Sequence, residues 1–216
     1  MEEKSLIFKK LFYEKRYNEL IFAIQTTLEE KKKTTPIQNL LGVCITLRSN
    51  GKSKEDLLWA TKIFKQAYLN ENQTNDGLLS LVNFINTSVD SNNFFDTEVN
   101  FKEIFHYFKE ANSFFGDNEG LILAILRVHK HLNNSEMILF YLKSLVEKKN
   151  CKISTFCSYI YFNCFKKEQN QKFFFDQSKL LEQNLPKYDE KDLVKIHDNK
   201  NDKIRLAFLS ADIVGR

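Results

Sequence analysis

This sequence of 216 residues contains few of the residues that interrupt helices, with only 6 glycines and 2 prolines. Turns between β-strands depend on such residues, so their scarcity argues against a β-rich protein and favours an all-α fold. The chain has no apolar run of about eighteen residues, and its first residues form no apolar signal core. We therefore expect a cytoplasmic protein without a membrane-spanning segment.

An excess of one charge is also missing, since 32 Lys and Arg oppose 28 Asp and Glu, for a net charge of +4. Nucleic-acid-binding proteins gather cations on one face, whereas lysine and glutamate are interspersed here, so no nucleic-acid partner is expected. The four cysteines lack the close pairwise spacing of a zinc site, and no metal site is expected. Cys157 and Cys164 lie seven residues apart on one face of a predicted helix, which predicts buried thiols.

What the chain does contain is helical periodicity in paired segments, most clearly within residues 39–67. A glycine on the first helix of this pair and an alanine on the second would let the backbones approach, with a phenylalanine ring beside them. The small residues are Gly42, Ala60 and Ala67, and the large ones are Leu41, Ile45 and Phe64. This pattern is typical of the tetratricopeptide repeat, a helix–turn–helix unit of about 34 residues that buries its apolar face against neighbouring units.

Degenerate versions of this pair extend over residues 1–186, which we assign as a tetratricopeptide-like α-solenoid of about five helix pairs. Pro36 is expected in the first turn of one helix, and Ser53 is expected to cap the next. A turn is expected at Ser91, Asn92 and Asn93. The remaining predicted helices cover residues 4–16, 17–32, 75–89, 98–112, 118–132, 135–148, 153–165 and 169–184.

After the repeats the pattern changes twice. Residues 187–202 are polar and charged, which indicates a linker. Residues 203–216 then begin with an apolar, extended run that predicts a single buried strand, ending in Ser210 and Asp212. Because one strand has no partner for its backbone groups, we interpret this segment as the start of a truncated α/β domain.

The strand has the sequence KIRLAFLSAD over residues 203–212. This motif resembles the first catalytic strand of the SPINDLY-like branch of the protein O-linked N-acetylglucosaminyltransferases, and residues 159–186 are similar to the segment that joins repeats to catalysis there. The resemblance implies that the chain is the N-terminal repeat module of such a glycosyltransferase. The module would present an acceptor protein to a catalytic region further along, with UDP-GlcNAc as the donor of the full-length parent. By itself the chain is expected to hold no catalytic residue and no cofactor.

Two groups of residues are candidate binding sites. Ser210 and Asp212 follow the predicted strand, where open α/β sheets place ligand contacts, but turn-forming residues that cap a following helix are an equal alternative. On the inner face of the repeats, where the transferases grip acceptor peptides through an asparagine ladder, the ladder positions hold Leu40 and Ser80. The polar residues that we expect on this peptide groove are Asn39, Asp76, Asn83 and Asn86, with simple solvation as the alternative.

The same residues support a second function, a stand-alone tetratricopeptide adaptor that binds a partner protein or peptide in its groove. A helical-repeat RNA binder is disfavoured by the small net charge of +4 and the irregular repeat period.

Overall fold

A computed structural model of the chain describes residues 2–27, 34–148, 151–164 and 171–184. The regular secondary structure of these residues is entirely α-helical, which confirms the predicted all-α class. The predicted linker and C-terminal strand lie outside the described residues. The helices are α1 (Glu2–Tyr13), α2 (Tyr17–Thr27), α3 (Thr35–Arg48), α4 (Lys54–Asn70), α5 (Asn75–Phe95), α6 (Phe101–Phe115), α7 (Glu119–His131), α8 (Ser135–Val146), α9 (Ile153–Asn163) and α10 (Gln171–Asn184).

The helix starts follow from local sequence. Each helix from α4 to α8 begins after a Ser, Thr or Asn whose side-chain oxygen accepts a hydrogen bond from a backbone N–H three residues on. Such N-caps satisfy donors that a helix leaves unpaired. Ser53 caps α4 as predicted, with 3.2 Å between its Oγ and the Asp56 nitrogen. Pro36 lies in the first turn of α3, also as predicted.

Helix α5 ends six residues later than expected, because the predicted turn at Ser91, Asn92 and Asn93 is helical. Ser91 is buried, and its Oγ lies 2.7 Å from the Thr97 hydroxyl. The Asn92 side chain donates to the Thr97 carbonyl at 2.5 Å. These polar side chains bind the chain that follows α5 instead of ending the helix, and the backbone turns at Asp96, where φ is 50°.

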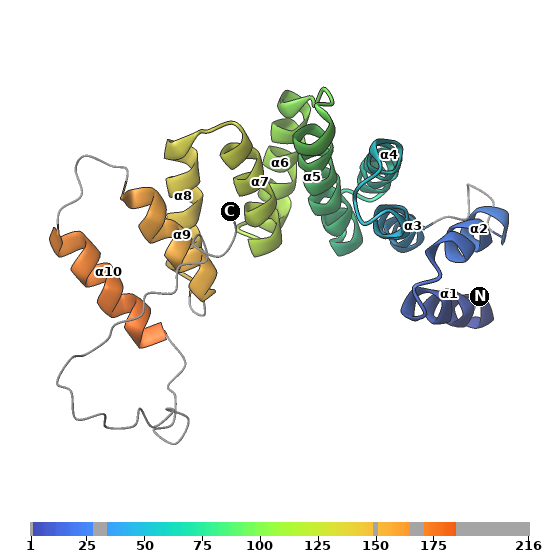
Figure 1. Ribbon diagram of the computed structural model, residues 1–216, viewed down its shortest axis with the longest axis horizontal. Coiled ribbons are helices and arrows are strands. Elements are labelled where there is room, and N and C mark those ends of the chain that lie inside the picture. The colour runs from blue at the N-terminus through green and yellow to red at the C-terminus, as the bar shows by residue number, and fades with distance from the viewer. Residues whose placement is uncertain (1, 28–33, 149–150, 165–170, 185–216) are drawn as a thin grey trace, which may run out of the picture.

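The helices follow one another in an extended row from α1 to α10 (Figure 1). Each helix contacts the next, and α5 also contacts both α3 and α7, so these three helices lie side by side in one layer. Helices α4 and α6 both pack against α5 and are joined by an ion pair between Lys65 and Glu103, 2.7 Å long. They form a second layer. In the part of the chain that the structure describes, no helix is both long and apolar enough to cross a membrane.

Side-chain contacts between successive helix pairs recur at a nearly constant separation in sequence. The bonded residues are 38 apart for Lys65 with Glu103, 38 for Asn72 with Glu110, 37 for Arg127 with Asp90, 38 for His131 with Asn93 and 41 for Asn39 with Ser80. Four of these contacts join α3 with α5, α4 with α6, or α5 with α7, and the fifth joins α6 to Asn72, which follows α4. The α3–α4 and α5–α6 pairs therefore pack with equivalent helices side by side, and α7 lies beside α5 in the same way.

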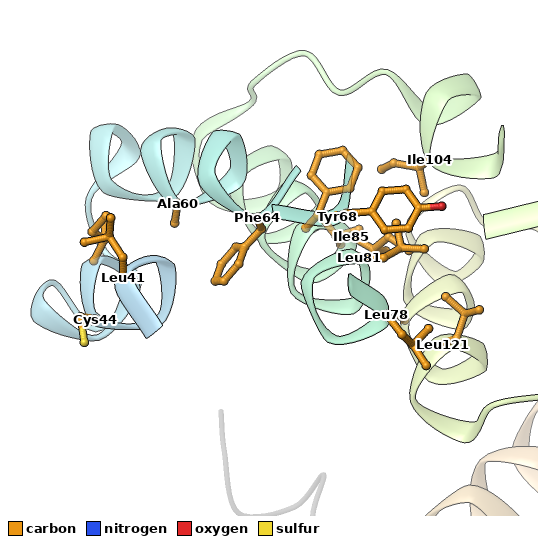
Figure 2. Packing of buried hydrophobic residues seen from close by; sticks show 14 of the residues in the cluster. Leu41, Cys44, Ala60, Phe64, Tyr68, Leu78, Leu81, Ile85, Ile104 and Leu121 are labelled. Atoms are coloured by element: carbon orange, nitrogen blue, oxygen red, sulfur yellow. The ribbon is translucent and has the colours of Figure 1, made fainter. Parts of the chain in front are cut away.

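The close contact predicted between Gly42 and Phe64 is confirmed. A Cβ atom on Gly42 would lie only 2.6 Å from the Phe64 ring, so α3 approaches α4 as closely as a glycine allows. Figure 2 shows the Phe64 side chain extending from α4 toward α3. Ala60 is fully buried on the same helix. The missing side chain at Gly42 thus makes room for the Phe64 ring between these two helices.

The prediction that Cys157 and Cys164 are buried is wrong, since both thiols are exposed. Helix α9 instead buries Phe156 and Asn163, which are also seven residues apart but lie about 100° further round the helix. The aromatic ring removes more apolar surface from water than a thiol does. Cys44 is buried in α3, and burial raises the pKa of its thiol to about 12.

Candidate functional site

One face of α5 is left uncovered by the helices around it. Its partly or fully exposed side chains recur at helical spacing, whereas the other faces of α5 are buried against α3, α4, α6 and α7. Because α3 and α7 flank α5, this face forms the middle of the α3–α5–α7 layer. We call it the α5 stripe, and its members are Asp76, Leu79, Asn83, Asn86, Asp90 and Phe94.

The stripe carries two carboxamides one helical turn apart. The Asn83 side chain has no hydrogen-bond partner within the described residues. The Asn86 oxygen accepts a hydrogen bond of 2.9 Å from Arg127, while its amide nitrogen has no partner in the same residues. A carboxamide offers a donor and an acceptor side by side, the complement of a backbone peptide group. The stripe can therefore hydrogen-bond to the main chain of an extended peptide.

Arg127 extends from α7 to the α5 stripe and contacts two of its residues. Besides Asn86 it contacts Asp90, with 2.5 Å between its guanidinium and the carboxylate. One turn further along, the His131 ring lies 2.7 Å from the Asn93 side-chain oxygen. These contacts fix α7 against α5, and the ion pair neutralises the charge of Asp90.

The four predicted groove residues do not all lie on the stripe. Asn39 is buried between α3 and α5, where its side-chain nitrogen donates to the Asp76 carbonyl at 3.0 Å and to Ser80 at 2.7 Å. Its side-chain oxygen has no partner among the described residues. Asn39 therefore joins two helices, whereas Asp76, Asn83 and Asn86 share the exposed face. Their binding of a peptide stays a prediction.

A hollow of about 780 Å³ lies where the stripe reaches the C-terminal end of α5. Its size is within the usual range for ligand clefts, about 300–1,000 Å³. We call it the Phe94 hollow because the Phe94 ring, 67% exposed, contributes to its lining. It is lined by Thr46, Leu47, Asn50, Gly51, Lys52, Leu57, Asp90, Phe94 and Phe95.

The tight turn between α3 and α4 forms one wall of this hollow. Asn50 and Gly51 have φ values of 52° and 69°, in the left-handed region that these two residue types tolerate best. The turn adds Lys52 to the lining, and this ammonium makes no ion pair with any described residue. The other charged lining residue, Asp90, is already paired with Arg127. The Lys52 ammonium is therefore the charge in the lining that no described residue pairs.

The remaining predicted site, Ser210 and Asp212, lies outside the described residues. Within the described ranges, no group of three His, Cys, Asp or Glu side chains is placed to hold a metal ion.

Sequence reasoning missed Asp90, Phe94, Arg127 and Lys52. The expected turn at residues 91–93 ended the third opening helix at residue 89, just before the hollow. A signal was nevertheless present, because Asp90 and Phe94 continue the helical spacing of Asn83 and Asn86 by two further turns.

No protein-family model matches this sequence, and no curated protein or solved structure is significantly similar to it. The α5 stripe and the Phe94 hollow are therefore interpreted from their own chemistry.

Proposed function

We propose that this chain is a tetratricopeptide-like scaffold that binds an extended segment of a partner protein along the α5 stripe. Two features of the fold support the repeat architecture. Equivalent helices of neighbouring pairs bond at separations of 37 to 41 residues. The contact of Gly42 with Phe64 is the close approach of two helices that such repeats require.

The observation that carries the proposal is the pair of carboxamides at Asn83 and Asn86. Both lie on the exposed stripe, and in each side chain at least one polar amide atom has no hydrogen-bond partner among the described residues. Hydrogen bonds from these groups to a peptide backbone provide affinity that depends little on the sequence of the partner. Simple solvation is the competing interpretation, and it predicts that removing the carboxamides leaves binding unchanged.

A random peptide library displayed on phage supplies a direct test. Peptides selected on the wild-type protein should bind the double variant Asn83→Ala, Asn86→Ala about tenfold or more weakly, because each lost hydrogen bond contributes about 0.5–1.5 kcal/mol. Fluorescence polarisation with labelled peptides measures the change. Asn18→Ala, at an exposed position of α2, is the matched control and should leave affinity unchanged. Failure to enrich any peptide, or equal affinity for the double variant, would contradict the proposal.

The glycosyltransferase module is a second candidate, and it rests on the sequence of residues 203–212. In this proposal the stripe holds the acceptor protein while a separate catalytic region transfers N-acetylglucosamine from UDP-GlcNAc. Reading the coding sequence beyond Arg216 tests it. Continuation into a histidine-bearing loop and further α/β units would support the module, whereas an intact gene that stops at Arg216 would leave the adaptor as the proposal.

A further inference from the structure

We propose that the Phe94 hollow is the specificity pocket of the α5 stripe, and that it takes a large apolar side chain of the partner segment flanked by a carboxylate that pairs with Lys52. This inference rests on the proposed function. It adds the chemistry of the partner, which the carboxamides of the stripe do not specify.

The apolar part of the proposal follows from the exposed rings and aliphatic groups of the hollow. Phe94 is 67% exposed although it belongs to the longest described helix, and the partly exposed Leu47 and Phe95 line the same space. Covering these groups with an apolar side chain removes surface from water on both partners. A docked amphipathic helix would need a row of pockets at its own turn spacing. A single hollow at the end of a polar stripe fits one anchoring side chain of an extended segment.

The carboxylate follows from the charges of the lining. Lys52 is the charged lining residue that makes no ion pair among the described residues, since Arg127 neutralises Asp90 across 2.5 Å. An acidic residue beside the anchor would gain an ion pair with Lys52, whereas a basic residue would be repelled. Charge complementarity thus favours a partner whose apolar anchor lies next to Asp or Glu.

The stripe and the hollow are continuous, because Asp90 belongs to both. From Asn86 to Phe94 the helix rises about 12 Å, at about 1.5 Å per residue. An extended chain spans that distance in about four residues. The anchor is therefore expected about four residues from the part of the segment that binds the carboxamides.

Parallel selections of the phage-displayed library test this chemistry on the full chain, with wild type and Lys52→Glu as targets. Wild type should enrich peptides with a large apolar residue flanked by Asp or Glu, and Lys52→Glu should enrich Lys or Arg in that place. Labelled peptides selected on the wild type should bind Phe94→Ala about tenfold more weakly, because an apolar contact is lost. They should bind Lys52→Glu about fivefold more weakly, because an exposed ion pair becomes repulsive. Phe114→Ala and Lys109→Glu, exposed on α6 and away from the hollow, are the controls.

The possible results separate the two proposals. If peptides are enriched and lose affinity on Asn83→Ala, Asn86→Ala but not on Phe94→Ala or Lys52→Glu, the specificity pocket is wrong while the proposed function stands. The specificity pocket is also wrong if selections on wild type and on Lys52→Glu enrich the same charge beside the apolar residue. If no peptide is enriched, both proposals fail. Unchanged thermal unfolding of each variant, followed by circular dichroism, ensures that a loss of binding is not a loss of fold.

Discussion

The helices of this protein pack by two different chemistries in two neighbouring regions. Between α3, α4 and α5, glycine and alanine let backbones approach, as Gly42 does against the Phe64 ring. Around α6, large rings fill the space instead. Phe105 lies 5.2 Å from the His129 ring, and Phe108 lies 5.8 Å from Tyr141. We call these the small-residue region and the aromatic region.

The same difference is visible in the sequence, where the pattern of glycine and alanine is clearest within residues 39–67. Close packing tolerates only small side chains, so the small-residue region needs glycine and alanine at its contacts. The aromatic region keeps the register, since Lys65 of α4 still pairs with Glu103 of α6, but its spacing depends on ring shape. Helices can therefore keep their pairing with different residues at their contacts.

The sharpest way to break the small-residue region is Gly77→Ala, in the first turn of α5. A Cβ atom there would lie 1.8 Å from the Glu71 carbonyl oxygen, which belongs to the backbone and cannot rotate away. We expect a loss of about 3 kcal/mol or more in the free energy of unfolding, measured by urea denaturation. Gly120→Ala in α7 meets only the Asn118 side chain, at 3.3 Å, and should be close to neutral. Equal effects of the two changes would contradict the comparison.

The next largest effect is expected from Asp56→Asn at the α3–α4 turn. Asp56 is buried and is bound by the Arg48 guanidinium through two nitrogens, one of them at 2.9 Å. Losing these charge-assisted bonds should reduce the free energy of unfolding by about 1.5–3 kcal/mol.

The same change has a pH signature. Hydrogen bonding from Arg48 lowers the pKa of Asp56 below its ordinary value of 3.8. The stabilisation is therefore complete above that ordinary value and is lost as pH falls through the lowered pKa. Wild type and Asp56→Asn should converge in stability during acid denaturation, and a constant gap would refute this assignment.

Two small residues, one in α4 and one in α8, give a contrasting pair of substitutions. Ala67 in α4 is fully buried, and Ala67→Leu should cost about 1–3 kcal/mol through overpacking. Ser144 in α8 is partly exposed and borders a separate hollow, so Ser144→Leu should change stability by less than about 0.5 kcal/mol. Thermal unfolding of both variants measures the contrast, and a larger loss at Ser144 would reverse it.

The smallest effect concerns His129 in the aromatic region. Its ring lies between Phe105 and Tyr141, and burial lowers the pKa of His129 from its ordinary value of 6.5. The unfolded chain takes up the proton first, so this contribution is complete above pH 6.5 and is lost as pH falls through the lowered pKa. The Tm of the wild type should therefore be lower at about pH 5.5 than at about pH 7.5. His129→Phe should lose less, and His106→Phe at an exposed position should behave as wild type.

Short-range sequence signals predicted much of the fold. The Ser53 cap, Pro36 and the pairing of Gly42 with Phe64 each depend on residues close in sequence or on one adjacent helix. The failures share another cause. Ser91, Asn92 and Asn93 have turn propensities, but their side chains bind Thr97, a contact outside any local pattern. Helical periodicity places Cys157 and Cys164 on one face, but it does not say whether a neighbouring helix covers that face.

The candidate site was harder to predict than the helices. Asp76, Asn83 and Asn86 share a face, as their spacing predicts, but the burial of Asn39 depends on how closely α3 approaches α5. The Phe94 hollow combines the α3–α4 turn with the end of α5, which are distant in sequence. Only the packing of three helices brings Lys52 and Phe94 to one cavity.

Amide hydrogen exchange with and without a peptide selected on wild type tests most directly whether the partner binds the α5 stripe. We predict slower exchange within residues 83–95 of α5 and residues 46–52 at the α3–α4 turn, with little change in α6 and α8. Protection confined to α4 and α6 would place the partner on the second layer, and protection confined to α8 would place it away from the stripe; either result would contradict the proposed function.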